Sequence, residues 1–290
     1  MSLSVEFGRG IPLIQRHLVR GLASKLLCAL ISVSSSFSWG ALQVYPTRVL
    51  LNDAKQVTNI SLRHFGEKES SYRISTVFYR MKSDGNMEPV ENPSDSERPL
   101  TKYLKFSPRV VTLAPRGEQV VRVVYRGPKD LPEGEYRAHL HFEPTEAESG
   151  AEVIKLKGEN NINITLQAKI AVAVPVIFTH GKPSYETKLS SLQVVETKEK
   201  KPAISVDMSS SGSAYPFGDF VATFTPKGGK PEVVAVARSI ASYLPQRSVM
   251  VPQVDEKAKK FSGGKLRVEF REAVTSGDGK VITSIERELP

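Results

Sequence analysis

The chain has 290 residues, of which 40% are hydrophobic and 24% charged, a composition typical of a globular protein and not of a disordered or collagen-like chain. Its 40 Lys and Arg against 31 Asp and Glu give a formal charge of +9, but these residues are interspersed, and without a clustered basic face no nucleic-acid partner is predicted. The single cysteine, Cys28, lies near the N-terminus, so the sequence excludes a disulfide framework and a cysteine-based zinc site in the rest of the chain.

Residues 1–40 have the pattern of a secretory signal. Basic residues precede a short apolar run at 26–33, and small residues follow it up to Gly40. The run is shorter than the about 20 residues that cross a bilayer, and no later segment is long and apolar enough to do so. We expect a signal peptide cleaved near Gly40 and an exported protein that is not embedded in a membrane. An uncleaved amphipathic anchor is the alternative.

Alternating apolar and polar residues, separated by turn residues, predict extended strands along the first half of the remaining chain. The expected strands lie at 42–51, 57–64, 72–81, 104–113, 119–125, 136–142 and 162–174. Seven strands with short turns are the number found in an immunoglobulin-like sandwich, although the Cys…Trp…Cys pattern of antibody domains is absent. Residues 41–178 are therefore predicted to form the N-terminal domain.

The same alternation resumes after a boundary-like segment at 180–183. The expected strands of the second half lie at 189–196, 203–208, 217–225, 233–243, 248–252, 265–272 and 280–288. The run at 233–243 has the alanine content of a helix, but its β-branched valines and the proline that closes it favour a strand. The prediction is an all-β protein with two immunoglobulin-like β-sandwich domains in tandem, the second at 183–290.

No motif of an enzyme or of a bound cofactor is present in the sequence, so we predict neither catalysis nor a cofactor. The residues that come nearest to a metal site are His139, His141 and Glu143, which share one face of a strand because they alternate. We favour a solvent-facing polar face, with Leu140 and Phe142 turned to the core. No metal is predicted, and a metal-dependent enzyme using these three residues is the alternative.

The most regular alternation of the chain begins at Ile162. Apolar residues occupy one face of the predicted strand, and the parity continues upstream through two further apolar residues. These positions are Ile154, Leu156, Ile162, Ile164, Leu166, Ile170 and Val172. An ordinary half-buried strand explains the pattern. An apolar edge left open for a partner explains it as well, because proteins normally protect such edges.

Four stretches of sequence together resemble a known family. They are Tyr45–Val49, residues 106–122 with a Pro-x-Gly-x-Gln-x-x-Arg core, residues 131–137, and the strand at 162–174. In this order, behind a signal-like segment, they resemble the PapD-like periplasmic chaperones of the chaperone–usher pilus pathway over roughly residues 41–178. The sequence of residues 131–137 is more similar to the divergent, archaic branch of that family.

The resemblance implies a function. Such a chaperone lends its seventh strand to an incomplete pilin, or fimbrial, subunit until the subunit is assembled at the outer-membrane usher. By position, Ile162, Ile164 and Leu166 match the alternating donor residues of the family. The loop before this strand is long, so Ile154 and Leu156 are expected as additional donor residues.

The resemblance also implies an anchor for the carboxylate at the C-terminus of the subunit. Arg48 matches the cleft arginine of the family, whereas the accompanying lysine falls at Ala171. Lys169 lies two residues earlier on the same face, about 6.6 Å away, so Arg48 and Lys169 are the expected anchor. The alternative function is a secreted structural or adhesin subunit of a surface fibre built of two β-sandwiches.

Overall fold

The structure is a computed structural model that describes residues 42–146, 154–157, 163–166, 169–197, 202–253, 261, 263–274 and 279–290, with only the backbone at 154–157, 163–166 and 202. The described residues belong to one compact unit, Gly40–Pro290. The predicted signal peptide lies outside them. No helix within the described ranges is long and apolar enough to span a bilayer.

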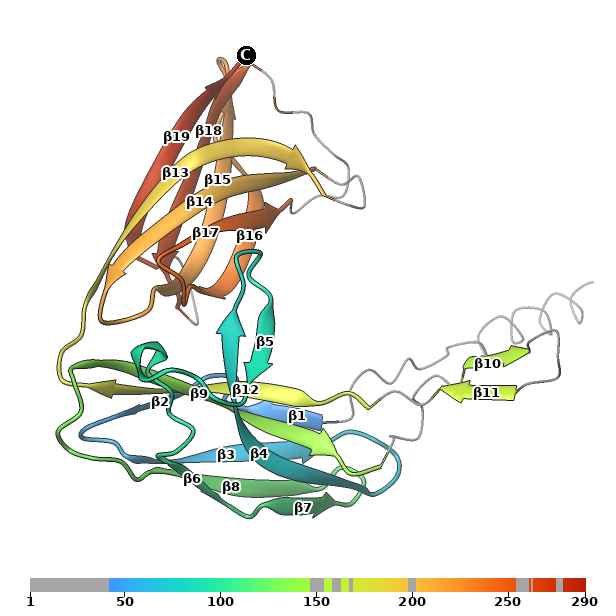
Figure 1. Cartoon of the computed structure of the whole chain (residues 1–290). Coiled ribbons are helices and arrows are strands. Elements are labelled where there is room, and N and C mark those ends of the chain that lie inside the picture. Colours follow the sequence, from blue (N-terminus) through green and yellow to red (C-terminus); the bar gives the residue numbers. More distant parts are fainter. Residues whose placement is uncertain are drawn as a thin grey trace, which may run out of the picture. The chain divides into compact units, whose positions relative to one another are not determined.

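Two facing sheets build the first sandwich, one in the order β1-β3-β8-β6 and one in the order β2-β12-β9-β4-β5, with β7 added beside β4 (Figure 1). Its strands are β1 Leu42–Tyr45, β2 Val49–Asn52, β3 Val57–His64, β4 Ser70–Met81, β5 Met87–Val90, β6 Leu104–Ser107, β7 Val110–Leu113, β8 Glu118–Tyr125, β9 Gly134–Pro144 and β12 Val172–His180. The short 3-10 helix Asp95–Glu97 lies between β5 and β6.

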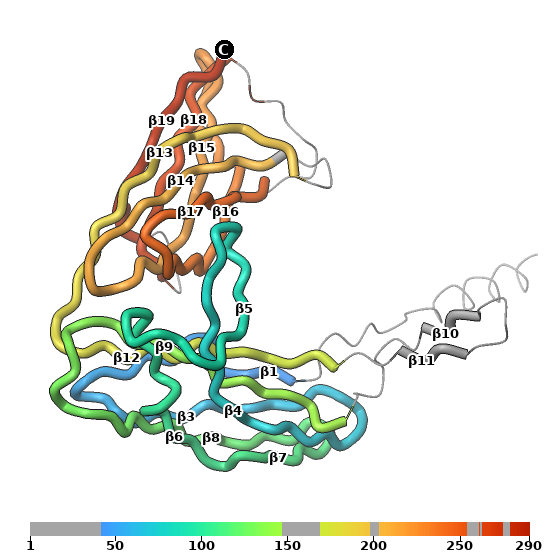
Figure 2. Tube along the Cα trace, in the orientation of Figure 1, coloured from blue at the N-terminus to red at the C-terminus, as the bar shows by residue number. Residues whose placement is uncertain are grey.

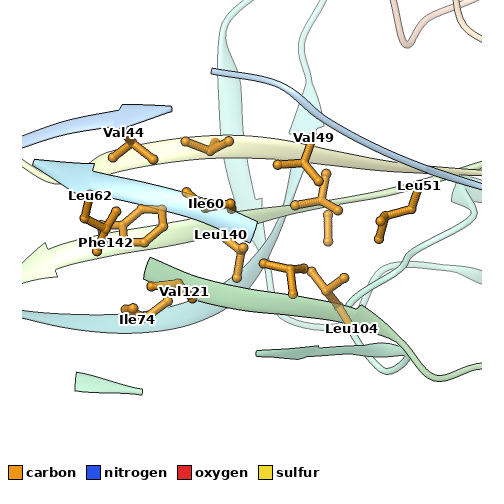
Figure 3. Close-up of a cluster of buried hydrophobic side chains, with 14 of the residues drawn as sticks. Val44, Val49, Leu51, Ile60, Leu62, Ile74, Leu104, Val121, Leu140 and Phe142 are labelled. Atoms are coloured by element: carbon orange, nitrogen blue, oxygen red, sulfur yellow. The ribbon is translucent and has the colours of Figure 1, made fainter. Parts of the chain in front are cut away.

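The core of this sandwich is formed by the inward-facing residues of both sheets. Val44, Ile60 and Leu62 come from one sheet, and Leu140 and Phe142 come from the other (Figure 3). Alternate residues of β3 are buried, as its period-2 pattern predicts, because successive side chains of a strand point to opposite faces. The apolar residues of the alternating sequence therefore face the core, and the polar residues between them face the surface.

The chain leaves β12 and enters β13, the first strand of a second sandwich with its own hydrophobic core (Figure 2). Its sheets have the orders β13-β14-β17 and β16-β15-β18-β19. The strands are β13 Tyr185–Glu196, β14 Pro202–Gly212, β15 Phe217–Pro226, β16 Glu232–Ala241, β17 Gln246–Pro252, β18 Gly264–Glu272 and β19 Val281–Leu289. The strand predicted at 233–243 is confirmed as β16, and the fold class of two β-sandwiches is confirmed with it.

Two predicted strands are each divided between the sheets. The strand expected at 42–51 is split at a bend that begins at Pro46, so that β1 pairs with β3 while β2 pairs with β12. The strand expected at 104–113 is split at Pro108 in the same way, with β6 beside β8 and β7 beside β4. Proline lacks the N–H that a continuous ladder needs, so both strands change sheets there.

The strand predicted at 162–174 begins later and ends later than expected. β11 covers Asn163–Leu166, residues 169–171 are not in a strand, and β12 runs from Val172 to His180. Pairing explains this difference, because the ladder with β9 starts at Val172 and the ladder with β2 starts only at Val176. The last strand of the first sandwich is therefore β12, and the segment with the most regular alternation precedes it.

Candidate functional site

Arg48 lies at the bend where the chain passes from β1 to β2. The next residue, Val49, pairs in parallel with Val176 of β12. The Arg48 Cζ atom is 3.9 Å from the centroid of the Phe217 ring, at the start of β15. A guanidinium over an aromatic face gains about 0.5–2 kcal/mol. Phe217 thus holds a half-buried arginine in place without neutralising its charge.

A pocket of about 680 Å³ opens beside Arg48. One wall comes from β2 and the turn after it, and the other comes from three aromatic side chains, Tyr185, Tyr215 and Phe217. Arg48 forms no ion pair with any other described residue. The pocket therefore offers the unpaired guanidinium of Arg48 to an anion, next to aromatic rings that can cover an apolar group.

The two carboxylates that line this pocket are already engaged. Asp53 accepts hydrogen bonds from Gly181 N at 2.9 Å and from His180 Nδ1 at 2.8 Å, and the Gly181 N–H, followed by His180, lowers the pKa of the Asp53 carboxyl. Glu135 Oε2 accepts a hydrogen bond from the backbone N–H of Tyr215 at 2.9 Å. Neither acid is directed to Arg48, so the guanidinium is available to a carboxylate from outside the chain.

Lys169 lies before the start of β12, whereas Arg48 lies beside the middle of that strand, next to Val49, which pairs with Val176. Its Nζ donates a hydrogen bond to the carbonyl oxygen of Thr145 at 2.8 Å. The part of β12 from Val172 to Val176 alone spans about 13 Å, and Lys169 precedes it while Arg48 lies beside the far end. The structure therefore does not bring Arg48 and Lys169 to one anion. Lys169 does not take the place, beside Arg48, of the family lysine that is missing at Ala171.

The apolar positions upstream of β12 form a hairpin. β10, Ile154–Lys157, pairs in antiparallel fashion with β11, with Ile154 opposite Leu166 and Leu156 opposite Ile164. Opposite positions of an antiparallel pair belong to the same face. The common parity had suggested that Ile154 and Leu156 extend the donor strand. They lie instead on a neighbouring strand, opposite the donor positions. Ile162 lies outside the described residues.

The first half of β12 is an open sheet edge. β9 pairs with β12 from Val172 onward, but β2 reaches only from Val176 to Thr179. Along Val172–Pro175 the side away from β9 therefore has no ladder partner among the described strands. Pro175 fits such a place, because proline is tolerated at strand edges. Open edges of this kind are where a partner strand can be added.

Exposed apolar side chains lie at both ends of this open edge. Ile170, just before β12, is 65% exposed, and Leu50, on β2, is 58% exposed. Tyr45, at the end of β1, is 72% exposed. Single exposed apolar residues are ordinary, but these three accompany an unpaired edge and a free cation. Together the edge, the apolar residues and Arg48 define the candidate site.

The alternating histidines do not form the solvent-facing face that the sequence suggested. His139 is only 8% exposed and packs edge-on against Tyr79, with ring centroids 5.0 Å apart. Burial, followed by the nearby Arg137 charge, lowers the pKa of His139 to about 4. Leu140 and Phe142 are buried as expected. In the described part of the chain, no three His, Cys, Asp or Glu side chains are grouped to hold a metal.

Sequence reasoning missed Phe217 and Arg137. Phe217 faces Arg48 across two sandwiches, and no local pattern connects residues so distant in sequence. Arg137 lies within the Leu-Pro-x-Gly-Glu-Tyr-Arg segment, where an alternating strand predicts only an inward or an outward position. Its burial as a cation depends on rings from both halves of the chain, which only the folded structure reveals.

No family model matches the chain, and no curated protein matches it. Among solved structures the chain is similar to the class 5 fimbriae chaperone CfaA, with 14% identity, a TM-score of 0.42, and coverage of 86% of this chain and 99% of that chain. It is similar to the CupB2 chaperone of Pseudomonas aeruginosa, with 12% identity, a TM-score of 0.41, and coverage of 86% and 100%. The E. coli chaperone DraB gives 12% identity, a TM-score of 0.40, and coverage of 86% and 96%.

Proposed function

We propose that this protein is a periplasmic chaperone that binds pilin subunits by lending them a strand and delivers them to an outer-membrane usher. The observation that carries the proposal is the open edge of β12 at Val172–Pro175, directly downstream of the apolar alternation in β11. A subunit strand added at that edge would continue the sheet by main-chain hydrogen bonds. The predicted signal peptide at 1–40 supplies the route to the periplasm.

The donor positions supply most of the affinity in this proposal. Ile162, Ile164 and Leu166 alternate, so a partner groove would receive all three from one face of the strand. Burying three aliphatic side chains contributes roughly 5–9 kcal/mol before the costs of ordering. The hairpin pairing with β10 covers one edge of β11 in the free protein, and Ile154 and Leu156 would add to the apolar contact from that hairpin.

Arg48 sets the orientation of the bound subunit strand in this proposal. A carboxylate at the C-terminus of the subunit would enter the pocket beside Arg48 and gain about 1.5–3 kcal/mol from a charge-assisted hydrogen bond. Because that pocket adjoins the start of β2, the anchored end would set the register of the added strand along β12. Lys169 is a separate contact in this scheme, at the other end of the edge, after it releases the Thr145 carbonyl.

No described feature favours the alternative of a fibre subunit. A pilin of this pathway would need an incomplete sandwich, whereas β12 fills the place between β2 and β9 in the first sandwich. Assembly of the purified protein into fibres would support the alternative. The chaperone proposal expects the purified protein to remain free of fibres without a subunit.

The test compares two substitutions on neighbouring positions of β11. Leu166→Glu places a charge on the donor face, and the matched control Thr165→Glu places the same charge on the opposite face. Co-expressed with a pilin subunit, the Leu166→Glu variant should lose co-purification while Thr165→Glu retains it. Melting temperatures close to that of the wild type would show that both variants are folded. Equal capture of the subunit by Leu166→Glu and wild type would reject the donor role.

A further inference from the structure

Arg137, on β9, is a buried cation held between aromatic rings. It is 3% exposed, and its Cζ lies 4.2 Å from the centroid of Phe78 and 4.3 Å from that of Tyr243. Its Nη1 donates a hydrogen bond to the carbonyl oxygen of Tyr79 at 2.5 Å. Two rings thus pack closely against the guanidinium, whose hydrogen bonds are made by the N–H groups along its edge.

The charge of Arg137 has no acid of its own. Glu97 acts on it electrostatically, but Arg80 holds the Glu97 carboxylate with two hydrogen bonds of 2.7 and 2.8 Å and lowers its pKa to about 2. Arg137 makes no ion pair with a described residue, and its buried Nε has no hydrogen-bond partner among them. A buried cation with an unsatisfied donor is costly unless an anion is bound near it.

A second arginine adds to the positive charge on the same side. Arg247 is half-buried, and its Nη1 donates to the Ala241 carbonyl at 3.1 Å and contacts the Met81 sulfur at 3.2 Å. Its Nε is also without a partner among the described residues. Met81 lines the same pocket as Arg137. The carboxylates nearest to these two arginines are Glu97, which lines the pocket and is bound by Arg80, and Asp84, which accepts hydrogen bonds from Asn86. The guanidinium groups thus outnumber the carboxylates in this region and make it positive.

The pocket is large enough for a small molecule, and both polar and apolar residues line it. Its volume is about 630 Å³, within the usual range for ligand sites. Besides Arg137, it is lined by Ser211, by Ser210, whose hydroxyl donates to the Leu244 carbonyl at 3.3 Å, and by an apolar wall of Leu244 and Pro245. An inorganic anion would leave the apolar wall uncovered, whereas a carboxylate on an apolar group would match both parts.

We propose that this pocket binds a small organic carboxylate, with the carboxylate directed to Arg137 and the apolar group against Tyr243, Leu244 and Pro245. A carboxylate oxygen is the acceptor that a guanidinium edge prefers, in the plane of the group. The site is distinct from the open edge of β12 and from the Arg48 pocket, so it neither requires nor supports the proposed chaperone function.

The test follows the Nε–Hε resonance of Arg137 by NMR while sodium benzoate, acetate or phosphate is added at neutral pH and constant ionic strength. Benzoate should shift this resonance saturably at millimolar concentration, at least about tenfold more tightly than acetate or phosphate. The absence of a saturable shift with benzoate would overturn the proposal. Acetate binding as tightly would overturn the apolar contact, and phosphate binding more tightly would overturn the carboxylate class.

Two variants assign the binding to this pocket. Arg137→Gln removes the observed resonance, so its affinity and that of the wild type are compared by isothermal titration; the variant should bind benzoate about tenfold or more weakly, the fold-change expected for loss of a charge-assisted hydrogen bond. Because a buried substitution can disturb folding, the exposed Ser211→Glu variant brings a negative charge to the pocket mouth, with Ser211→Gln as its neutral control. Ser211→Glu should weaken binding several-fold relative to Ser211→Gln. Equal affinities of that pair would overturn the site.

Discussion

Arg48 is held by a ring and not by a carboxylate, and this leaves its charge for a partner. The Phe217 ring fixes the guanidinium from one face, while the acids of the same pocket bind His180, Gly181 and Tyr215 instead. An arginine paired within its own chain would have to break that pair before binding an anion. The arrangement at Arg48 avoids that cost.

Removing the Arg48 charge should weaken subunit binding without unfolding the protein. Arg48→Ala should reduce affinity for a pilin subunit by about 10- to 100-fold, since a charge-assisted hydrogen bond contributes about 1.5–3 kcal/mol. The matched control is Arg63→Ala, an exposed arginine of β3 that also lies over a ring, Phe65, and forms an ion pair with Glu118. Binding is measured by isothermal titration. Equal affinity of Arg48→Ala and Arg63→Ala would contradict the anchor role.

His139 predicts how stability depends on pH. Burial lowers the pKa of His139 from 6.5 to about 4, so the unfolded chain binds a proton more readily than the folded protein does between these values. Stability is therefore complete above about pH 6.5 and is lost as the pH falls toward 4, by about 2–3 kcal/mol at pH 4.5. Urea unfolding at several pH values measures this change.

The control for this pH dependence is the neighbouring histidine of β9. His139→Gln should remove most of the loss of stability between pH 6.5 and pH 4.5, whereas His141→Gln, at a less buried position, should retain it. If His139→Gln kept the full wild-type slope, the slope would come from other groups. Because His139 is far from the proposed donor face in sequence, this prediction concerns the fold and not the binding of a subunit.

Among the elements, β12 connects the core with the open edge. Its second half lies between β2 and β9, with Ile177 and Phe178 buried, while its first half has only β9 beside it. One strand can therefore be firmly held at one end and ready to pair at the other. A rigid second half would keep the open part extended and reduce the ordering cost of binding.

Hydrogen exchange tests this difference along β12. When a pilin subunit binds, the amides of residues 172–174 that point away from β9 should exchange at least tenfold more slowly, because they gain a strand partner. Amides of Val176–Thr179, already between two strands, should change much less. Exchange at 172–174 that is unaffected by the subunit would contradict strand addition at this edge.

The sequence predicted most strands because alternation reports which face of a strand is buried. It placed β3, β8, β15 and β16 closely, since each has one partner sheet along its whole length. It did not predict the change of sheet at Pro46 and Pro108, or the late start of β12, because these depend on which neighbour is within reach. Phe217 beside Arg48 and the burial of His139 are likewise set by tertiary contacts that spacing does not encode.

At the scale of the whole molecule, the second sandwich contributes directly to the candidate site. Hydrogen bonds join the two sandwiches, including Arg98 Nη1 to the Ser213 carbonyl at 2.6 Å and the Glu135 N–H to the same carbonyl at 3.0 Å. Phe217, the first residue of β15 in the second sandwich, positions Arg48 of the first sandwich. The second sandwich is thus expected to be needed for anchoring and not only for stability.

The central claim is that the β11 segment enters a groove of the subunit, and site-specific cross-linking tests it most directly. Cys28 is the one cysteine of the chain and lies in the predicted signal peptide, so a cysteine introduced by Leu166→Cys would be the only one left in the processed protein. Mixed under oxidising conditions with a pilin subunit that carries one groove cysteine, Leu166→Cys should form the disulfide-linked complex, and Thr165→Cys, on the opposite face, should not. Equal cross-linking of the two variants, or none with Leu166→Cys, would contradict the account.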